Sequence, residues 1–427
     1  MNKIYNPIKA EWKDVLKRPT QTLAAIEDTV NTIFSEVEQD GDTVISKYTK
    51  QFDGVHLDSF LVSESELLQA QALVSEELKQ AIQLAKSNIE VFHKAQISEK
   101  VAVETTKGVT CWQEKRPIQK VGLYIPGGTA PLFSTILMLA VPATIAGCKE
   151  IVLCSPPNKE GKLHPAILYT ASLCGVTKII KAGGIQAIAG LTFGTETVPR
   201  VYKIFGPGNQ YVTVAKQIAT KHGVAIDMPA GPSELLVVAD DTANAAFVAS
   251  DLLSQAEHGI DSQVILVSTS KNMIAAVEKE VALQLEELPR KEIARQAIAN
   301  SKLIYVEDDQ TALDLINEYG PEHYIVCVAN EDFYVDNIVN AGSVFIGNYT
   351  PESAGDYASG TNHTLPTNGY AKQYSGVNLD SFMKAITFQK INETGIKAIG
   401  KAIELMAEAE GLQAHKNAVT LRLNSLK

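Results

Sequence analysis

Apolar and polar positions along the 427-residue chain follow two different patterns. Up to about residue 100, apolar residues recur at spacings of three and four, as in TQTLAAIEDTVNTIFSEVEQDG and SESELLQAQALVSEELKQAIQLAKSNIEVFHKA. Such spacing gathers the apolar side chains on one face of an α-helix. The first part of the chain is therefore predicted to form a long helical pair.

From residue 121 onward, short apolar runs alternate with amphipathic segments. The runs are VGLYIP, EIVLCS, KIIKAG, YKIFG, ELLVVAD, QVILVST, KLIYV, YIVCV and SVFIG. This alternation is typical of βαβ units, whose mostly parallel sheets are covered by helices on both faces. Because the runs are too many for one small sheet, the sequence predicts two α/β domains. After about residue 378 the strand pattern stops, and the rest is predicted to be helical.

Composition and charge narrow the functional classes. The chain is 45% apolar and long enough for two or three domains with sizeable cores. Its formal charge of -11 argues against nucleic-acid or anionic-membrane partners, which usually require a basic patch. The N-terminal sequence lacks an apolar signal core, and FSTILMLAVPATIAGC is shorter than a membrane span. We expect a cytoplasmic enzyme with small substrates, without a nucleic-acid or membrane partner.

The chain has five cysteines, which are spread along the sequence and form no C-x-x-C pair. An odd number with this spacing favours reduced and mostly buried thiols. They are Cys111, Cys148, Cys154, Cys174 and Cys327. A functional alternative makes Cys154, at the end of EIVLCSPP, a nucleophile that captures an aldehyde as a thiohemiacetal. Since no histidine lies near it in sequence, packing is the favoured interpretation.

Three loops rich in glycine and proline are candidate ligand sites: YIPGGTAP (124–131), FGPGNQYV (205–212) and IDMPAGPSE (226–234). Glycines allow backbone N–H groups to approach a phosphate, and a following helix N-terminus adds a favourable dipole. The dinucleotide fingerprint G-x-G-x-x-G fails because its third glycine is Tyr211, and no G-x-x-x-x-G-K-[ST] occurs. Spacing alone leaves phosphate contact and ordinary tight turns equally open.

A Glu-His pair occurs twice, in SQAEHG and in GPEHYI. In the first, Gln255 and His258 share a helix face and offer an oxygen and a nitrogen to a metal. For the pair alone, a histidine interacting with the C-terminal dipole of its helix is the favoured interpretation. In the second, Glu322 and His323 follow a Gly-Pro break at a strand entrance. They could supply two proton-transfer groups, or they could form a solvated turn.

Other candidate metal ligands lie far away in the sequence. Asp356 and His363 occur in the loop ESAGDYASGTNHT, and His415 occurs in the C-terminal segment LQAHKN. Spacing does not assemble them into a site.

The segment IDMPAGPSELLVVADDTANAAFVASDLLSQAEHG (226–259) resembles the signature of the histidinol dehydrogenase family. The resemblance continues through RPIQKVGLYIPGGTAPLFSTILMLA, GGIQAIAGLTFGTETVP, KIFGPGNQYVTVAK, GPEH, NAGSVFIGNYTPESAGDYASGTNHTLPT and LQAHKNAVTLRLN, without a departure at a motif position. It implies an enzyme with one zinc per subunit that ends histidine biosynthesis. Such an enzyme oxidises L-histidinol to L-histidine with two NAD+, through a bound aldehyde.

The resemblance also implies roles for particular residues. Those expected to bind zinc are Gln255, His258, Asp356 and His415. Those expected to move protons are Glu322 and His323, and those expected to contact NAD are Tyr124, Gln186 and Asn209. Those expected to contact the substrate are Ser233, Glu410, His323 and the four zinc ligands, with His363 near them.

Domain organisation and assembly are further implications of the resemblance. The expected parts are an N-terminal helical segment (1–19), a discontinuous α/β domain with the zinc site (20–123 and 235–377), an inserted NAD-contacting α/β domain (124–234) and a C-terminal helical segment (378–427). Both α/β domains would resemble incomplete Rossmann folds. The family is a homodimer whose C-terminal segment reaches the neighbouring site, so His415 and Glu410 would act in trans.

Two other functional classes stay open. A zinc hydrolase of a small polar substrate could use the same His, Asp and Glu side chains with a metal-bound water. A two-domain binding protein would have a cleft between its α/β lobes, but such proteins usually carry an export signal, and the sequence shows none.

Overall fold

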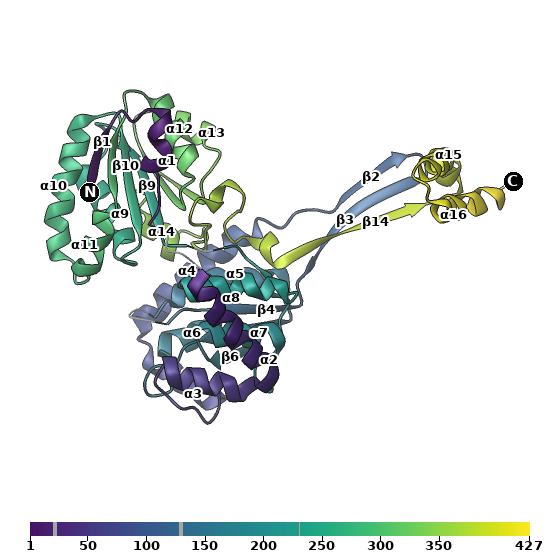
Figure 1. The fold of residues 1–427 in the computed structure, drawn as a ribbon, viewed down its shortest axis with the longest axis horizontal. Helices are drawn as coiled ribbons and strands as arrows, with labels where there is room; N and C mark the ends of the chain where they lie inside the picture. The colour runs from purple at the N-terminus through teal and green to yellow at the C-terminus, as the bar shows by residue number, and fades with distance from the viewer. Residues whose placement is uncertain (20–23, 128–130, 230) are drawn as a thin grey trace.

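The computed structural model describes residues 1–19, 24–127, 131–229 and 231–427. Two parallel sheets covered by helices form two adjacent α/β units, and a long arm projects from them (Figure 1). This arrangement confirms the predicted fold class. Among the described residues, no helix combines the length and apolar character needed to cross a bilayer.

The first unit contains a five-stranded parallel sheet in the order β6-β5-β4-β7-β8. Its strands are β4 (Lys120–Tyr124), β5 (Glu150–Ser155), β6 (Lys178–Lys181), β7 (Lys203–Phe205) and β8 (Ala225–Ile226). Its connecting helices are α5 (Phe133–Ala146), α6 (Pro165–Leu173), α7 (Gly184–Phe193) and α8 (Gln210–Lys221). The chain adds strands on one side of β4 and then crosses to the other, so a switch point lies between β4 and β7. Open α/β sheets bind ligands at such points.

The predicted helical region contains α2 (Ala24–Phe52), α3 (Glu64–Leu73) and α4 (Glu76–Lys94). The predicted long helical pair is wrong, because α2 joins the core of one face of the five-stranded sheet whereas α3 and α4 join the core of the other. Parallel strands present apolar side chains on both faces, and each face needs a cover. These contacts also differ from the predicted grouping of 20–123 with 235–377, and the other boundaries of that division stay predictions.

The second unit contains a six-stranded parallel sheet in the order β1-β11-β10-β9-β12-β13. Its strands are β1 (Asn2–Tyr5), β9 (Glu234–Ala239), β10 (Gln263–Ser268), β11 (Lys302–Tyr305), β12 (His323–Cys327) and β13 (Ser343–Ile346). Its helices are α1 (Trp12–Val15), α9 (Ala245–Ala256), α10 (Lys271–Glu287), α11 (Lys291–Ala299), α12 (Asp309–Tyr319), α13 (Glu331–Asn337) and α14 (Glu352–Tyr357). The order reverses between β9 and β12. The prediction that residues 1–19 are helical missed β1, which pairs with β11 along the sheet edge.

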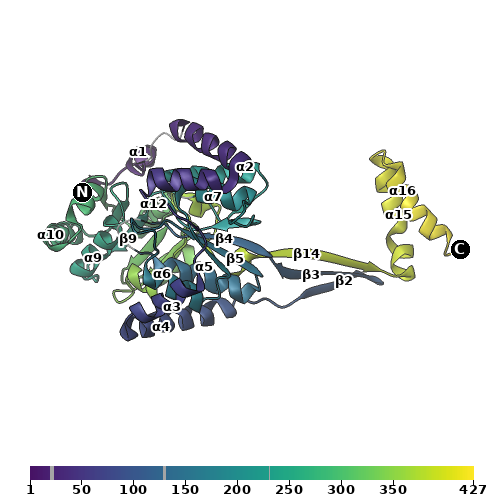
Figure 2. The ribbon, with the colours of Figure 1, turned by 90° about the horizontal axis from the view of Figure 1, so that it is seen from below.

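The arm consists of an antiparallel sheet in the order β14-β3-β2, with two helices at its far end (Figures 1 and 2). Its elements are β2 (Val101–Thr106), β3 (Val109–Pro117), β14 (Met383–Ile391), α15 (Glu393–Ala409) and α16 (Gln413–Asn424). Short 3-10 helices occur at Lys9–Glu11, Tyr370–Lys372 and Leu379–Phe382. Strand β14 corrects the expectation that strands stop near residue 378.

Apolar side chains on the arm are left exposed. Met406 on α15 is 65% exposed, Leu421 on α16 is 62% exposed, and within the described chain α16 has no buried residue. An apolar surface of this kind usually marks a contact with another molecule.

Candidate active site

A cavity of about 770 Å³, here called the central cavity, is lined by residues of both α/β units. The six-stranded unit contributes Gln255, His258, Glu322, His323 and Asp356, and the five-stranded unit contributes the loop after β7 and the start of α5. The structure therefore brings together the predicted proton-transfer pair and three of the four predicted zinc ligands.

The chain places Glu322 and His323 at the amino end of β12. Gly320 ends α12 with a φ of +61°, and His323 then starts β12 opposite Leu235 of β9. Both side chains are buried, with Glu322 6% and His323 4% exposed, so the pair does not form a solvated turn. Ligands of open α/β sheets usually bind at the carboxyl ends of strands, so the site at the amino end of β12 departs from the general rule for this fold.

Glu322 and His323 are held by hydrogen-bonding contacts with Glu234 and Gln255. The Glu322 Oε2 atom accepts from the backbone N–H of Glu234 at 2.8 Å and from Gln255 Nε2 at 3.4 Å. His323 Nδ1 lies 3.2 Å from the Glu234 carbonyl oxygen and 3.6 Å from Glu322 Oε2. His323 Nε2 is buried without a hydrogen-bond partner in the described structure and lies 3.7 Å from Asp356 Oδ1.

The neighbouring donor set has the chemistry of a metal site. Side-chain atoms of His258, Glu352 and Asp356 lie within 4.8 Å of one another. Gln255 donates from Nε2 to the Glu234 carbonyl at 3.1 Å, while its Oε1 is buried without a partner among the described residues. Sequence reasoning missed Glu352, although it precedes Asp356 by four residues on α14 and therefore shares its helix face.

Crowded carboxylates shape the electrostatics of this cavity. Burial alone would lower the pKa of His323, but the carboxylates of Glu352 and Glu322 raise it well above its usual value. The pKa of Glu352 is raised by burial and by Asp356 and Glu322, and Glu352 Oε2 has no partner in the part of the chain described. Buried negative charge and unpartnered oxygen atoms fit a divalent cation with nitrogen and oxygen ligands.

Two further predicted residues also line the central cavity, namely Ser233 and His363. His363 Nδ1 lies 2.9 Å from the Asp356 carbonyl oxygen, and its Nε2 lies 3.1 Å from the Thr135 hydroxyl at the start of α5. His363 therefore links the metal-site loop to the other α/β unit.

His415 and Glu410 do not reach this cavity in the same chain. His415 lies on α16 and Glu410 follows α15, both at the far end of the arm (Figures 1 and 2).

A second cavity of about 1140 Å³ lies at the carboxyl ends of strands in the five-stranded sheet, and Tyr124, Gln186 and Asn209 all line it. The Tyr124 hydroxyl accepts from the Gly184 N–H at 3.1 Å, and burial raises the pKa of Tyr124 to about 12. The Gln186 amide is buried without a partner among the residues described. Asn209 and Tyr211 line both cavities, which therefore lie next to each other.

Two of the three glycine-rich loops, 124–131 and 205–212, contribute to the second cavity, whereas the loop 226–234 lines the central cavity. Gly206 has a φ of +125°, and a Cβ atom there would lie 2.1 Å from the Tyr124 carbonyl oxygen, so only glycine fits. Tyr211, which replaces the third glycine of the dinucleotide fingerprint, lines both cavities. Residues 128–130 and 230 of the predicted loops lie outside the described residues.

Cys154 belongs to the hydrophobic core of the five-stranded sheet and is fully buried. Burial raises the pKa of its thiol, which opposes formation of the nucleophilic thiolate. The cysteines form no disulfide among the described residues.

Comparisons with known proteins point to one family. The chain matches the family model described as histidinol dehydrogenase over residues 16–423. It is 60% identical to the histidinol dehydrogenase of Bacteroides thetaiotaomicron over 100% of both chains. It is 52% identical to that of Xanthomonas campestris over 96% of this chain and 95% of the relative. The crystal structure of histidinol dehydrogenase from Elizabethkingia anophelis matches with a TM-score of 0.98 at 57% identity, over 100% of this chain and 98% of that one.

Proposed function

The chain belongs to the histidinol dehydrogenase family of NAD-dependent oxidoreductases, and we propose that it oxidises L-histidinol to L-histidine in two NAD-dependent steps through bound histidinal. One observation carries the proposal. The buried pair Glu322 and His323 lies beside a nitrogen and oxygen donor set, in a cavity that shares Asn209 with a second, larger cavity.

The second cavity is the proposed NAD site, with Tyr124, Gln186 and Asn209 as cofactor contacts. Its position at the carboxyl ends of strands, beside the reversal of strand order, is where Rossmann-like sheets bind nucleotides. Because the two cavities adjoin at Asn209, the nicotinamide ring would approach a substrate in the central cavity while the rest of the cofactor occupies the second. A hydrolase would need no such second cavity, which disfavours that alternative.

Zinc is the proposed metal, held by Gln255, His258 and Asp356 together with His415 of the partner subunit. When bound, the zinc would orient the amino and imidazole nitrogens of histidinol and oppose the carboxylate charge that raises the pKa of His323.

His323 is the proposed base of the first oxidation. Gln255 Nε2 lies 3.1 Å from the Glu234 carbonyl oxygen, 3.1 Å from His323 Nδ1 and 3.4 Å from Glu322 Oε2. His323 Nδ1 lies 3.2 Å from the same carbonyl oxygen, to which a proton on Nδ1 would donate. Nε2 has no hydrogen-bond partner among the described residues. With bound zinc opposing the carboxylate charge, the ring would be neutral and Nε2 free to accept a proton. Nε2 then accepts the hydroxyl proton of histidinol while the carbinol carbon transfers a hydride to NAD+, which gives histidinal and NADH.

Glu322 is the proposed base of the second oxidation. Water must add to the aldehyde before a second hydride can leave, and the Glu322 carboxylate accepts the proton of that water. The resulting hydrate transfers its hydride to a second NAD+ and becomes the carboxylate of histidine. Ser233, and Glu410 of the partner subunit, are the remaining proposed substrate contacts.

A homodimer with shared sites is the proposed assembly. The exposed apolar side chains of α15 and α16, and the distance of these helices from their own chain's cavities, support an arm that binds a second copy. The predicted cytoplasmic location stays a prediction.

The test is an NADH assay with purified protein, L-histidinol and NAD+. We expect two NADH per histidinol, loss of activity after treatment with a chelator, and recovery on adding zinc. A yield near one NADH per histidinol would contradict the two-step proposal. Full activity in a protein shown to be metal-free would contradict the zinc site.

A further inference from the structure

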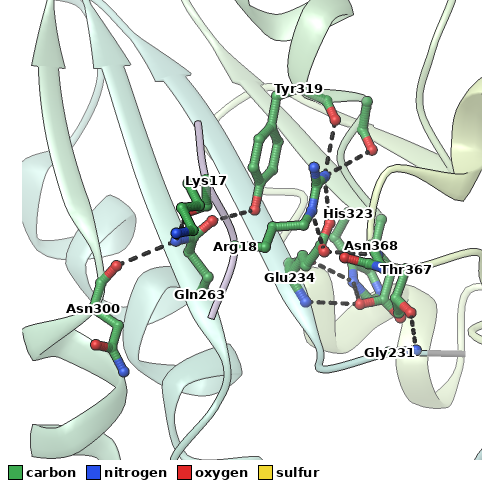
Figure 3. A network of polar contacts seen from close by, with 12 residues as sticks. Lys17, Arg18, Gly231, Glu234, Gln263, Asn300, Tyr319, His323, Thr367 and Asn368 are labelled. Atoms are coloured by element: carbon green, nitrogen blue, oxygen red, sulfur yellow. Dashed lines mark hydrogen bonds and ion pairs between the residues drawn. The ribbon is translucent and has the colours of Figure 1, made fainter. Parts of the chain in front are cut away.

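An ion pair lies directly behind the central cavity, between Arg18 and Glu234 (Figure 3). Arg18 Nε and Nη2 donate to the two carboxylate oxygens of Glu234 at 2.5 and 2.9 Å. Nη2 also donates to the Tyr319 carbonyl at 2.8 Å, and the guanidinium lies 3.9 Å from the centroid of the Tyr319 ring. The two charged side chains are 15% and 2% exposed. A bidentate pair with these contacts fixes orientation as well as charge.

The backbone of Glu234 contacts three site residues, as Figure 3 shows in part. Its N–H donates to Glu322 Oε2, and its carbonyl lies within hydrogen-bonding distance of Gln255 Nε2 and His323 Nδ1. Glu234 is the first residue of β9, where the preceding loop enters the sheet. Holding its side chain therefore fixes the peptide groups on which the site residues depend.

We propose that Arg18 and Glu234 are positioning residues, whose ion pair fixes the Glu234 backbone and thereby orients Gln255, Glu322 and His323. Neither side chain lines the central cavity, so both act through the residues they hold. This inference rests on the proposed function of those three residues. It assigns the N-terminal segment a part in catalysis, because Arg18 follows α1 and brings its charge from outside the six-stranded sheet.

The test compares Arg18→Met, Arg18→Lys, Glu234→Gln and the double variant Arg18→Met/Glu234→Gln. Measurements are zinc affinity by competition with a chelator, kcat and KM for histidinol and for NAD+, and Tm. Each single variant should lower zinc affinity and kcat by about 10- to 100-fold, as expected for residues that hold metal ligands and bases. KM for NAD+ should not change, since neither residue lines the second cavity.

Two comparisons separate positioning from general stability. Arg18→Lys should not restore kcat, because an ammonium cannot donate to both carboxylate oxygens in a planar fork. The zinc affinity and kcat of the double variant should be at least as high as those of the less active single variant. Each single change leaves a buried charge without its partner, whereas the double change removes both charges. Additive losses would mean that the two residues act independently.

Trp12→Ala is the matched control for loosening of the N-terminal segment. Trp12 is buried in the core of the six-stranded sheet and donates to the Pro7 carbonyl at 3.0 Å, and in the described structure it forms no hydrogen bond with Glu234. This variant should lower Tm while keeping wild-type zinc affinity and kcat. Equal losses of zinc affinity in Trp12→Ala and Arg18→Met would overturn the inference, as would wild-type zinc affinity and kcat in Arg18→Met.

The outcomes also distinguish this inference from the proposed function. If Arg18→Met does not fold, the milder Arg18→Lys carries the same prediction of reduced zinc affinity and kcat. If the wild-type protein does not oxidise histidinol, the proposed function fails. If the wild-type protein is active and the ion-pair variants keep its kcat and zinc affinity, only the positioning role of Arg18 and Glu234 is contradicted.

Discussion

A dimer with shared sites can be tested by combining two inactive variants. Strand β14 has 9 residues and at about 3.3 Å per residue spans about 30 Å, so His415 beyond it lies far outside the roughly 2 Å of a zinc–nitrogen bond to its own chain's site. His258→Asn removes a proposed zinc ligand from the cavity, and His415→Asn removes a proposed zinc ligand from the arm. Each homodimer then lacks one zinc ligand in both of its sites, and we expect both to be inactive.

Mixing restores activity only if the arm serves the other subunit. In a mixed dimer, the cavity of the His415→Asn chain receives an intact His415 from the His258→Asn chain, while the second site lacks both ligands. Random association of equal amounts makes about half of the dimers mixed, each with one complete site, so activity should recover to about one quarter of wild type. Purified mixed dimers should reach about one half.

The assay is NADH formation after the two variants, carrying different tags, are co-expressed or refolded together. Two differently tagged copies of the same variant serve as the control and should show no recovery. Purified mixed dimers without activity would refute the shared site. Wild-type zinc content and activity in His415→Asn alone would show that the arm supplies no ligand.

Three further predictions concern single residues. Glu322→Gln should spare oxidation of histidinol more than oxidation of histidinal, measured with each substrate separately, and equal losses would contradict the division of labour between Glu322 and His323. Burial raises the pKa of Asp251 to about 7, so the folded state resists its ionisation and the protein loses stability as pH rises from about 4 to about 7. Asp251→Asn should therefore increase the free energy of unfolding above pH 7 by at most about 4 kcal/mol, measured as a higher Tm. This gain should vanish toward pH 4. Cys154→Ala should keep its activity in the NADH assay while lowering Tm, because its thiol packs in the core, and a large loss of kcat at unchanged zinc content would revive the covalent alternative.

Burial explains which strands could be predicted from sequence. The nine apolar runs all lie in strands of the two parallel sheets, where helices cover both faces and almost every position is apolar. The strands of the arm were not predicted, because they have no core that would impose a pattern. All six residues of β2 are exposed, and most of β14 is as well. Strand β8 has only 2 residues, too few for any periodicity.

Local spacing could place Gln255 and His258 on one helix face, and the structure brings both to the central cavity. Local spacing could not show whether Glu322 and His323 are buried, because the residues that pack around them lie on β9, β13 and α14, which are distant in sequence. Arg18 and Glu234 are 216 residues apart, and no pattern along the chain connects them.

The two units have the same order of strands around their switch points but use opposite ends of their sheets. The five-stranded sheet opens its second cavity at the carboxyl ends, and the six-stranded sheet places Glu234 and His323 at the amino ends of β9 and β12. In the proposed function, this opposition separates the phosphates of NAD from the crowded carboxylates that would repel them. Asn209 sits at the junction and also caps α8 by accepting from the Val212 N–H at 3.1 Å. Because Asn209 starts α8, its position is tied to that helix, and a fixed position here would help to orient the two proposed sites for hydride transfer.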